Sequence, residues 1–204
     1  MINETINFLV PDPNTKVDLV IHDWGAYFGL LYENKYTSRV NKMVIIDVGM
    51  LRSRHMKLYQ FIVIALYQWW FAFAYVISQV FSWTLGNFIY LLYKWICPRF
   101  LSPLKQWEYN LLKRELSVTY CALYYNFWKA FFFRGNKEFI HQKFPTVKTL
   151  FMYGVDKNIY FHDQSFFDKL NLTEGSRAIA VEGSGHWIML SNPSLFVKEL
   201  KDFL

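Results

Sequence analysis

The segment Leu19-Val20-Ile21-His22-Asp23-Trp24-Gly25-Ala26 constrains the fold of this chain more than any other. The apolar run from Val17 to Ile21 predicts a buried β-strand, and the small and helix-compatible residues from Gly25 onward predict a helix. Asp23 would lie at the tip of the sharp turn between them. Such a turn holds one side chain exposed and strained beside the N–H groups of the helix start. A carboxylate in that place can attack an electrophilic carbon and form an ester.

A second informative segment lies near the C-terminus. The sequence Arg177–Val181 predicts a short strand, and a glycine-rich loop with His186 follows it. Asn192 suits a helix N-cap, and Pro193 suits the first helical position. The helix predicted for 194–204 would turn four apolar residues to the core, namely Leu195, Phe196, Leu200 and Phe203. Neutral His186 is suited to take a proton from water, because the ordinary pKa of histidine lies near neutral pH.

Together these two segments resemble the α/β-hydrolases. The Asp23-Trp24 pair is similar to the epoxide hydrolase and haloalkane dehalogenase branch. Ile21 departs from the general pattern, which prefers Gly there, although some dehalogenases are similar to this chain at that position. The resemblance implies an α/β fold: the C-terminal part of a doubly wound hydrolase sheet, with a large helical cap insertion. It also implies that Asp23 is the nucleophile and that His186 activates the water that cleaves the resulting ester.

A third residue should orient His186, and two acids are candidates. Asp47 ends the predicted strand Met43–Ile46, 24 residues after Asp23, where some dehalogenases carry their acid. Asp156 follows the predicted strand 149–154, one residue short of the position that relatives usually use. We rank Asp47 slightly above Asp156 and keep both.

The predicted domains are hydrolase core at 1–50, an aromatic-rich helical cap at 51–145, and core again at 146–204. Residues Leu58–Tyr93 form a run of 36 without Asp, Glu, Lys, Arg or His. Epoxide hydrolases use cap tyrosines as O–H donors to the epoxide oxygen, so the resemblance makes Tyr124 and Tyr125 candidate donors. In a dehalogenase, the indole N–H of Trp24 would help to hold the departing halide.

The uncharged run also raises the question of a membrane span. Phe61–Phe81 is long enough to cross a bilayer, but Trp83–Ile96 has 14 residues, fewer than the roughly 20 that a crossing needs. A single crossing would separate Asp23 from His186. We therefore expect the run Leu58–Tyr93 to pack on the core or to make peripheral contact with a membrane.

Composition excludes several other classes of function. The chain has 204 residues with 22 Lys or Arg against 16 Asp or Glu, and the basic residues are scattered. We therefore expect no nucleic-acid partner. The aromatic-rich insertion instead favours a small apolar substrate. Cys97 and Cys121 form no metal-ligand pattern, so we expect no metal and no cofactor. No secretory signal is recognisable, which predicts a cytoplasmic or membrane-associated protein.

The position of the nucleophile strand predicts an incomplete core. In the family, several strands precede this one, and one of their loops carries a His-Gly pair that binds an oxyanion. This chain reaches the strand by Val17 and has no His-Gly pair before Asp23. We therefore expect a fragment with an apolar sheet edge at 18–21, or a shortened inactive relative.

The resemblance favours a hydrolase that uses Asp23 and His-activated water on an apolar, epoxide-like substrate. Two alternatives stay open. One is a haloalkane dehalogenase-like enzyme, for which the sequence supplies no convincing second halide ligand. The other is a catalytically inactive relative that binds lipid or a partner through its apolar insertion.

Overall fold

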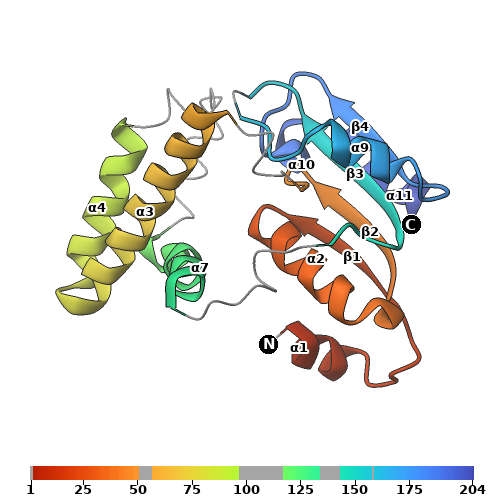
Figure 1. Cartoon of the computed structure of the whole chain (residues 1–204), viewed down its shortest axis with the longest axis horizontal. Coiled ribbons are helices and arrows are strands. Elements are labelled where there is room, and N and C mark those ends of the chain that lie inside the picture. Colours follow the sequence, from red (N-terminus) through yellow and green to blue (C-terminus); the bar gives the residue numbers. More distant parts are fainter. Residues whose placement is uncertain (1, 51–56, 97–116, 134–142, 158) are drawn as a thin grey trace. The chain divides into compact units, whose positions relative to one another are not determined.

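The computed structural model of this chain describes residues 2–50, 57–96, 117–133, 143–157 and 159–204. The chain forms two compact units (Figure 1). The sheet unit comprises residues 1–53, 141–156 and 160–204, and the helical unit comprises residues 54–140 and 157–159.

The sheet unit is built on four parallel strands in the order β1-β2-β3-β4. Their bounds are β1 (Val17–His22), β2 (Val40–Ile46), β3 (Lys148–Gly154) and β4 (Arg177–Val181). Residues from both sides of the insertion are direct neighbours in the sheet, since Ile45 of β2 pairs with Phe151 of β3. Because the strands are parallel, their carboxyl ends meet at one edge, and the loops that follow them come together there.

Helices cover both faces of this sheet, which confirms the predicted doubly wound α/β fold. The first helices in the chain are α1 (Ile2–Leu9) and α2 (Trp24–Lys35), followed by the 3-10 turn η1 (Thr37–Arg39). The later ones are α9 (Gln164–Leu170), α10 (Ile188–Ser191) and α11 (Pro193–Phe203).

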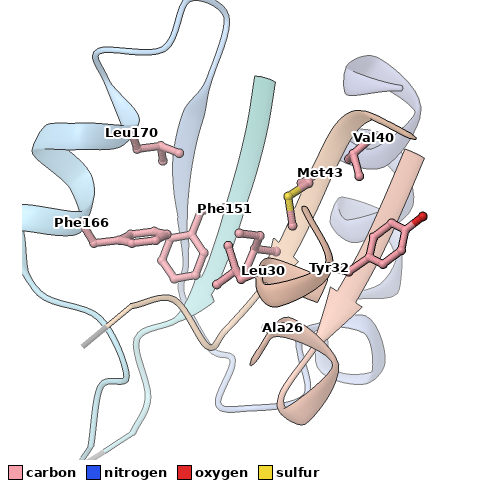
Figure 2. Close-up of a cluster of buried hydrophobic side chains, with 9 residues drawn as sticks. Ala26, Leu30, Tyr32, Val40, Met43, Phe151, Phe166 and Leu170 are labelled. Atoms are coloured by element: carbon pink, nitrogen blue, oxygen red, sulfur yellow. The ribbon is translucent and has the colours of Figure 1, made fainter. Parts of the chain in front are cut away.

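The two faces of β2 show how the core is divided. Met43 and Ile45 point to one face, where α2 and α9 pack (Figure 2). Val44 and Ile46 point to the other face, where α10 and α11 pack. Side chains alternate across a strand, so a strand buried on both faces is apolar at nearly every position. The first cluster consists of Ala26, Leu30, Tyr32, Val40, Met43, Ile45, Phe151, Phe166 and Leu170.

The last helix follows its predicted signals. The Asn192 side chain accepts a hydrogen bond from the backbone N–H of Leu195, and Pro193 occupies the first turn. Phe203 is buried against the sheet, with three partly buried neighbours on the same side, Leu195, Phe196 and Leu200. The cap and the apolar face of this helix are confirmed.

The helical unit consists of α3 (Leu58–Val80), α4 (Trp83–Ile96), η3 (Val118–Cys121) and α7 (Ala122–Phe133). Both α4 and α7 pack on α3. Its buried centre is formed by Ala74, Tyr90, Val118 and Cys121, with Phe71, Tyr75 and Ile89 packed around them. In the described part of the insertion between β2 and β3, the chain is therefore mainly helical.

Candidate active site

Asp23 occupies the turn between β1 and α2 in a strained backbone conformation. Its φ of 53° and ψ of −122° lie in a region that residues other than glycine seldom adopt. The carbonyl of Asp23 accepts the N–H of Ala26 at 3.0 Å, whereas its side chain makes no capping hydrogen bond to the helix. The carboxylate is 44% exposed. The turn therefore presents an accessible carboxylate at the positive end of a helix.

Ile21, which departs from the family pattern, has a structural partner in Gly29 of α2. A Cβ added at Gly29 would lie 2.7 Å from the Cδ1 atom of Ile21. The absence of a side chain at Gly29 therefore makes room for the larger residue on the strand. This pairing lets α2 approach β1 closely enough to form the sharp turn at Asp23.

Asp47 lies directly after β2, at the same edge of the sheet, and is fully buried. Its φ is 64°, and its backbone N–H donates to the carbonyl of Met152 at 2.7 Å. One carboxylate oxygen accepts the N–H of Gly154 at 3.1 Å, and the other lies 2.6 Å from Nδ1 of His186. A buried carboxylate held by two such contacts has a single orientation.

His186 connects the two acids. Its Nδ1 faces Asp47, and its Nε2 lies 3.8 Å from the Oδ1 atom of Asp23. A neutral imidazole has one N–H, so donation of that proton to Asp47 leaves Nε2 as an acceptor directed at the turn that carries Asp23. Asp47, His186 and Asp23 thus have the arrangement of a hydrolase catalytic triad, in which an acid orients a histidine that faces a third side chain.

Asp156, the other predicted acid, lies in the loop after β3. Its backbone N–H donates to the carbonyl of Ser184 at 3.0 Å, two residues before His186. Buried Ser184 also accepts a hydrogen bond from the hydroxyl of Ser191 at 2.8 Å. The structure therefore assigns Asp47 to the Nδ1 contact, while the main chain of Asp156 supports the loop that carries His186.

The sequence alone indicated no role for His22, yet this residue packs directly on the site. Its ring centroid lies 4.4 Å from that of His186 and 4.8 Å from that of Trp187. Nε2 of His22 lies 3.0 Å from the carbonyl oxygen of His186. Because a carbonyl only accepts, Nε2 carries the proton and donates it. His22 thus holds the backbone of His186, and its position next to Asp23 was the only signal in the sequence.

We expect His22 to make the folded state sensitive to acid. Burial, and next the nearby His186, lower the pKa of His22 from 6.5 to about 4. Between pH 6.5 and about 4 the unfolded chain therefore binds a proton that the folded chain rejects, so stability is retained above this window and falls within it. The fall should be on the order of 2–3 kcal/mol. Urea unfolding at pH 7 and pH 4.5 would measure it.

The matched variant for this prediction is His22→Gln, which keeps an N–H donor near the carbonyl of His186 but does not titrate. Its unfolding free energy should change less between the two pH values than that of the wild type. An equal change in both proteins would show that His22 is not the responsible group.

Gly154, at the end of β3, is expected to tolerate no side chain. A Cβ at this position would collide with the carbonyl oxygens of Ser184 and Gly185. Gly154→Ala should therefore push the His186 loop outward and lower the unfolding free energy by about 1–3 kcal/mol. Gly25→Ala is the matched control, since a Cβ there meets nothing within 4 Å. Thermal unfolding of both variants would test this, and equal stability would contradict it.

The remaining predicted site residues lie in different units. Trp24 is the first residue of α2, and its ring packs on Tyr27 and Phe28 with centroids 5.7 and 6.0 Å away. Tyr124 and Tyr125 lie on α7 in the helical unit. There, Tyr124 packs on Phe71 at 4.9 Å and Tyr125 on Tyr75 at 5.4 Å. A role for these tyrosines toward a substrate stays a prediction. Within the described ranges, no three His, Cys, Asp or Glu residues are grouped to hold a metal ion.

Comparison with known proteins agrees with the hydrolase-like fold that this geometry indicates. The family model for the alpha/beta hydrolase fold matches residues 8–193. No curated protein matches the sequence significantly. A solved esterase from a marine microorganism has a TM-score of 0.60 at 14% identity, covering 100% of this chain and 74% of that one.

Two further solved structures come from the branches that the Asp-Trp pair is similar to. Epoxide hydrolase CorEH has a TM-score of 0.61 at 15% identity, covering 99% of this chain and 71% of its own. The haloalkane dehalogenase DatA from Agrobacterium tumefaciens, as a point mutant, has a TM-score of 0.58 at 13% identity, covering 98% and 70%. At such identities the likeness concerns the fold alone.

Proposed function

Because this chain belongs to the α/β-hydrolase fold family, we propose that it hydrolyses small apolar epoxides through an ester formed on Asp23. The observation that carries the proposal is the line of contacts from Asp47 through His186 to Asp23. In this scheme Asp23 is the nucleophile, His186 the general base and Asp47 the acid that orients the base.

In the first step, a carboxylate oxygen of Asp23 attacks one carbon of the epoxide ring. A new C–O bond forms, the ring C–O bond breaks, and the released alkoxide takes a proton from an O–H donor. Tyr124 and Tyr125 are the donors proposed for this proton. The strained, 44% exposed position of Asp23 supports attack, since the carboxylate is not engaged in capping α2.

In the second step, water attacks the carbonyl carbon of the ester and gives one proton to Nε2 of His186. The bond between the ester carbonyl carbon and the alkyl oxygen then breaks, and that oxygen takes the proton from His186. The products are a diol and the regenerated Asp23 carboxylate, and the remaining proton of the water returns to the O–H donor. The buried Asp47 carboxylate stabilises the imidazolium that forms between these two events. Negative charge on the ester carbonyl would develop at the N-terminus of α2, where the helix dipole favours it.

A haloalkane is the second candidate substrate class, because the same carboxylate could displace a halide. Trp24 supports it, since it directly follows the nucleophile at the start of α2. We rank epoxides first, as a halide needs two N–H donors and we identify one. The uncharged, aromatic-rich run Leu58–Tyr93 favours an apolar substrate in either case.

Repeated turnover in water enriched in heavy oxygen tests the proposal directly. Water attacks the enzyme's own carboxyl carbon, so solvent oxygen should accumulate in Asp23 while the original oxygen leaves in the diol. Mass spectrometry of the peptide that contains Asp23 would detect one or two heavy oxygens after incubation with an apolar epoxide such as styrene oxide.

A parallel incubation without epoxide is the control and should leave the peptide unlabelled. Diol formation with label only in the product would mean that water attacks the substrate directly. That result would remove Asp23 from its proposed role while keeping the chain a hydrolase.

A further inference from the structure

One side of helix α3 carries a stripe of exposed apolar side chains. The residues recur at spacings of three, four and seven, so they share one helical face. Their exposed fractions range from 45% to 74%. This outer stripe consists of Leu58, Ile62, Leu66, Trp69, Phe73 and Val80.

The opposite face of α3 is already used. Ile64, Ala74 and Ser78 are buried where α4 and α7 pack on the helix. A helix of a soluble domain normally turns charged and polar residues outward, whereas α3 contains no charged residue at all. The exposed face of α3 therefore lacks the charged side chains that are typical of a solvent-facing helix.

The stripe continues onto α7. The ring of Trp69 lies 5.5 Å from that of Trp128, which in turn lies 5.5 Å from both Phe131 and Phe132. Phe131 and Phe132 are 40% and 59% exposed. Two helices thus form one apolar surface with tryptophan in it, a residue that is enriched where membranes meet water.

Among the described residues, α3 is one helix whose length and composition would allow it to cross a membrane. It has 23 residues, and its most apolar 18-residue window has a mean hydropathy of 1.7 and is 17% buried. A single crossing conflicts with the sheet, however. Strands β2 and β3, on either side of the insertion, pair directly in one sheet, so the chain must return to the side from which it came. The neighbouring α4 has 14 residues, fewer than the roughly 20 required.

The distribution of basic residues favours a membrane with anionic lipids. Residues 54–140 carry ten Lys or Arg against three Asp or Glu, whereas the rest of the chain carries twelve against thirteen. The basic excess of the protein therefore falls within residues 54–140. Lys57 immediately precedes α3, and exposed Lys129 lies on α7. Basic side chains beside an apolar stripe complement the headgroups of anionic lipids.

We propose that the helical unit binds an anionic lipid bilayer, with the outer stripe of α3 lying in the plane of the interface. The apolar side chains enter the boundary between headgroups and acyl chains, and the lysines contact the phosphates. The bilayer is not crossed. This inference is independent of the proposed function, because it does not involve Asp23 or His186.

Flotation of the full-length chain with lipid vesicles tests the proposal. The protein should float with vesicles that contain phosphatidylserine and much less with phosphatidylcholine alone. About 1 M salt should weaken the binding, since screening is then nearly complete. Alkaline carbonate should release the protein.

The informative variant is Leu66→Gln combined with Phe73→Gln, which removes two stripe residues without changing charge. It should bind at least about tenfold more weakly, because two large apolar side chains are lost. Leu172→Gln with Val197→Gln is the matched control, as both residues are exposed and apolar but lie in the sheet unit. Circular dichroism would establish that both variants are folded.

Quenching of tryptophan fluorescence by brominated lipids gives a second measurement that needs no variant. Quenching of the wild type by shallow bromine labels supports the inference. Failure to float, equal loss in both double variants, or retention in carbonate would each overturn it. Self-association of the protein through the stripe would also overturn the proposal. It would be seen if the stripe variant no longer self-associates but still binds vesicles.

Discussion

His186→Gln is expected to stop the reaction after its first step. Asp23 can still attack the epoxide, because the nucleophile lies on a different element from the base and is positioned by the β1–α2 turn. Without Nε2 of His186, no group accepts the proton of the attacking water, and the ester persists. Intact mass spectrometry should show one substrate mass added per chain, located by digestion to the peptide that contains Asp23.

Asp23→Ala is the control for this trap and should show no adduct and no turnover. The double variant Asp23→Ala/His186→Gln should behave in the same way, since removal of the nucleophile precedes any effect of the base. If His186→Gln yields no adduct with epoxides or haloalkanes while the wild type hydrolyses acyl esters, the Asp nucleophile is excluded.

Asp47→Asn should slow hydrolysis of the ester strongly and leave its formation nearly unchanged. An amide N–H in place of the carboxylate would favour the wrong tautomer of His186, because Nδ1 could no longer donate to it. Loss of the corresponding contact in a serine protease lowers the rate about 10⁴-fold, and an effect on the order of 10³–10⁴ is expected here. Rapid-quench measurement of ester formation and decay would separate the two steps.

Asp156→Asn is the matched comparison, since it changes the other acid near the His186 loop. We expect its ester hydrolysis to stay within a few-fold of the wild type, because Asp156 contacts Ser184 through its backbone N–H, which the substitution retains. A larger loss in Asp156→Asn than in Asp47→Asn would reverse the assignment of the acid.

Local patterns in the sequence predicted most of the sheet unit. The strands at Val17 and Arg177 begin where expected, and the cap formed by Asn192 follows from its residue type. These features depend on neighbours within a few positions, so they are readable along the chain. The turn at Asp23 is also predictable from local sequence, since an apolar strand precedes it and the start of a helix follows it.

The choice between Asp47 and Asp156 could not be made in this way. Both acids follow predicted strands, and both lie near the same edge of the sheet. The deciding contacts join residues 139 and 107 positions apart, His186 to Asp47 and Gly154 to Asp47. Those contacts depend on the pairing of β2 with β3, which brings the residue after Ile46 beside the end of β3.

By itself, therefore, the sequence determined the sharp turn at Asp23, the loop that carries His186, the order of strands and helices, and the apolar insertion. Each is encoded in residue types that are close together in the chain. Only the tertiary structure decided that Asp47 faces His186, that His22 holds the histidine backbone, and that the free face of α3 is apolar. These depend on which distant segments pack together, because a carboxylate, an imidazole or a leucine takes its role from the groups that packing places beside it.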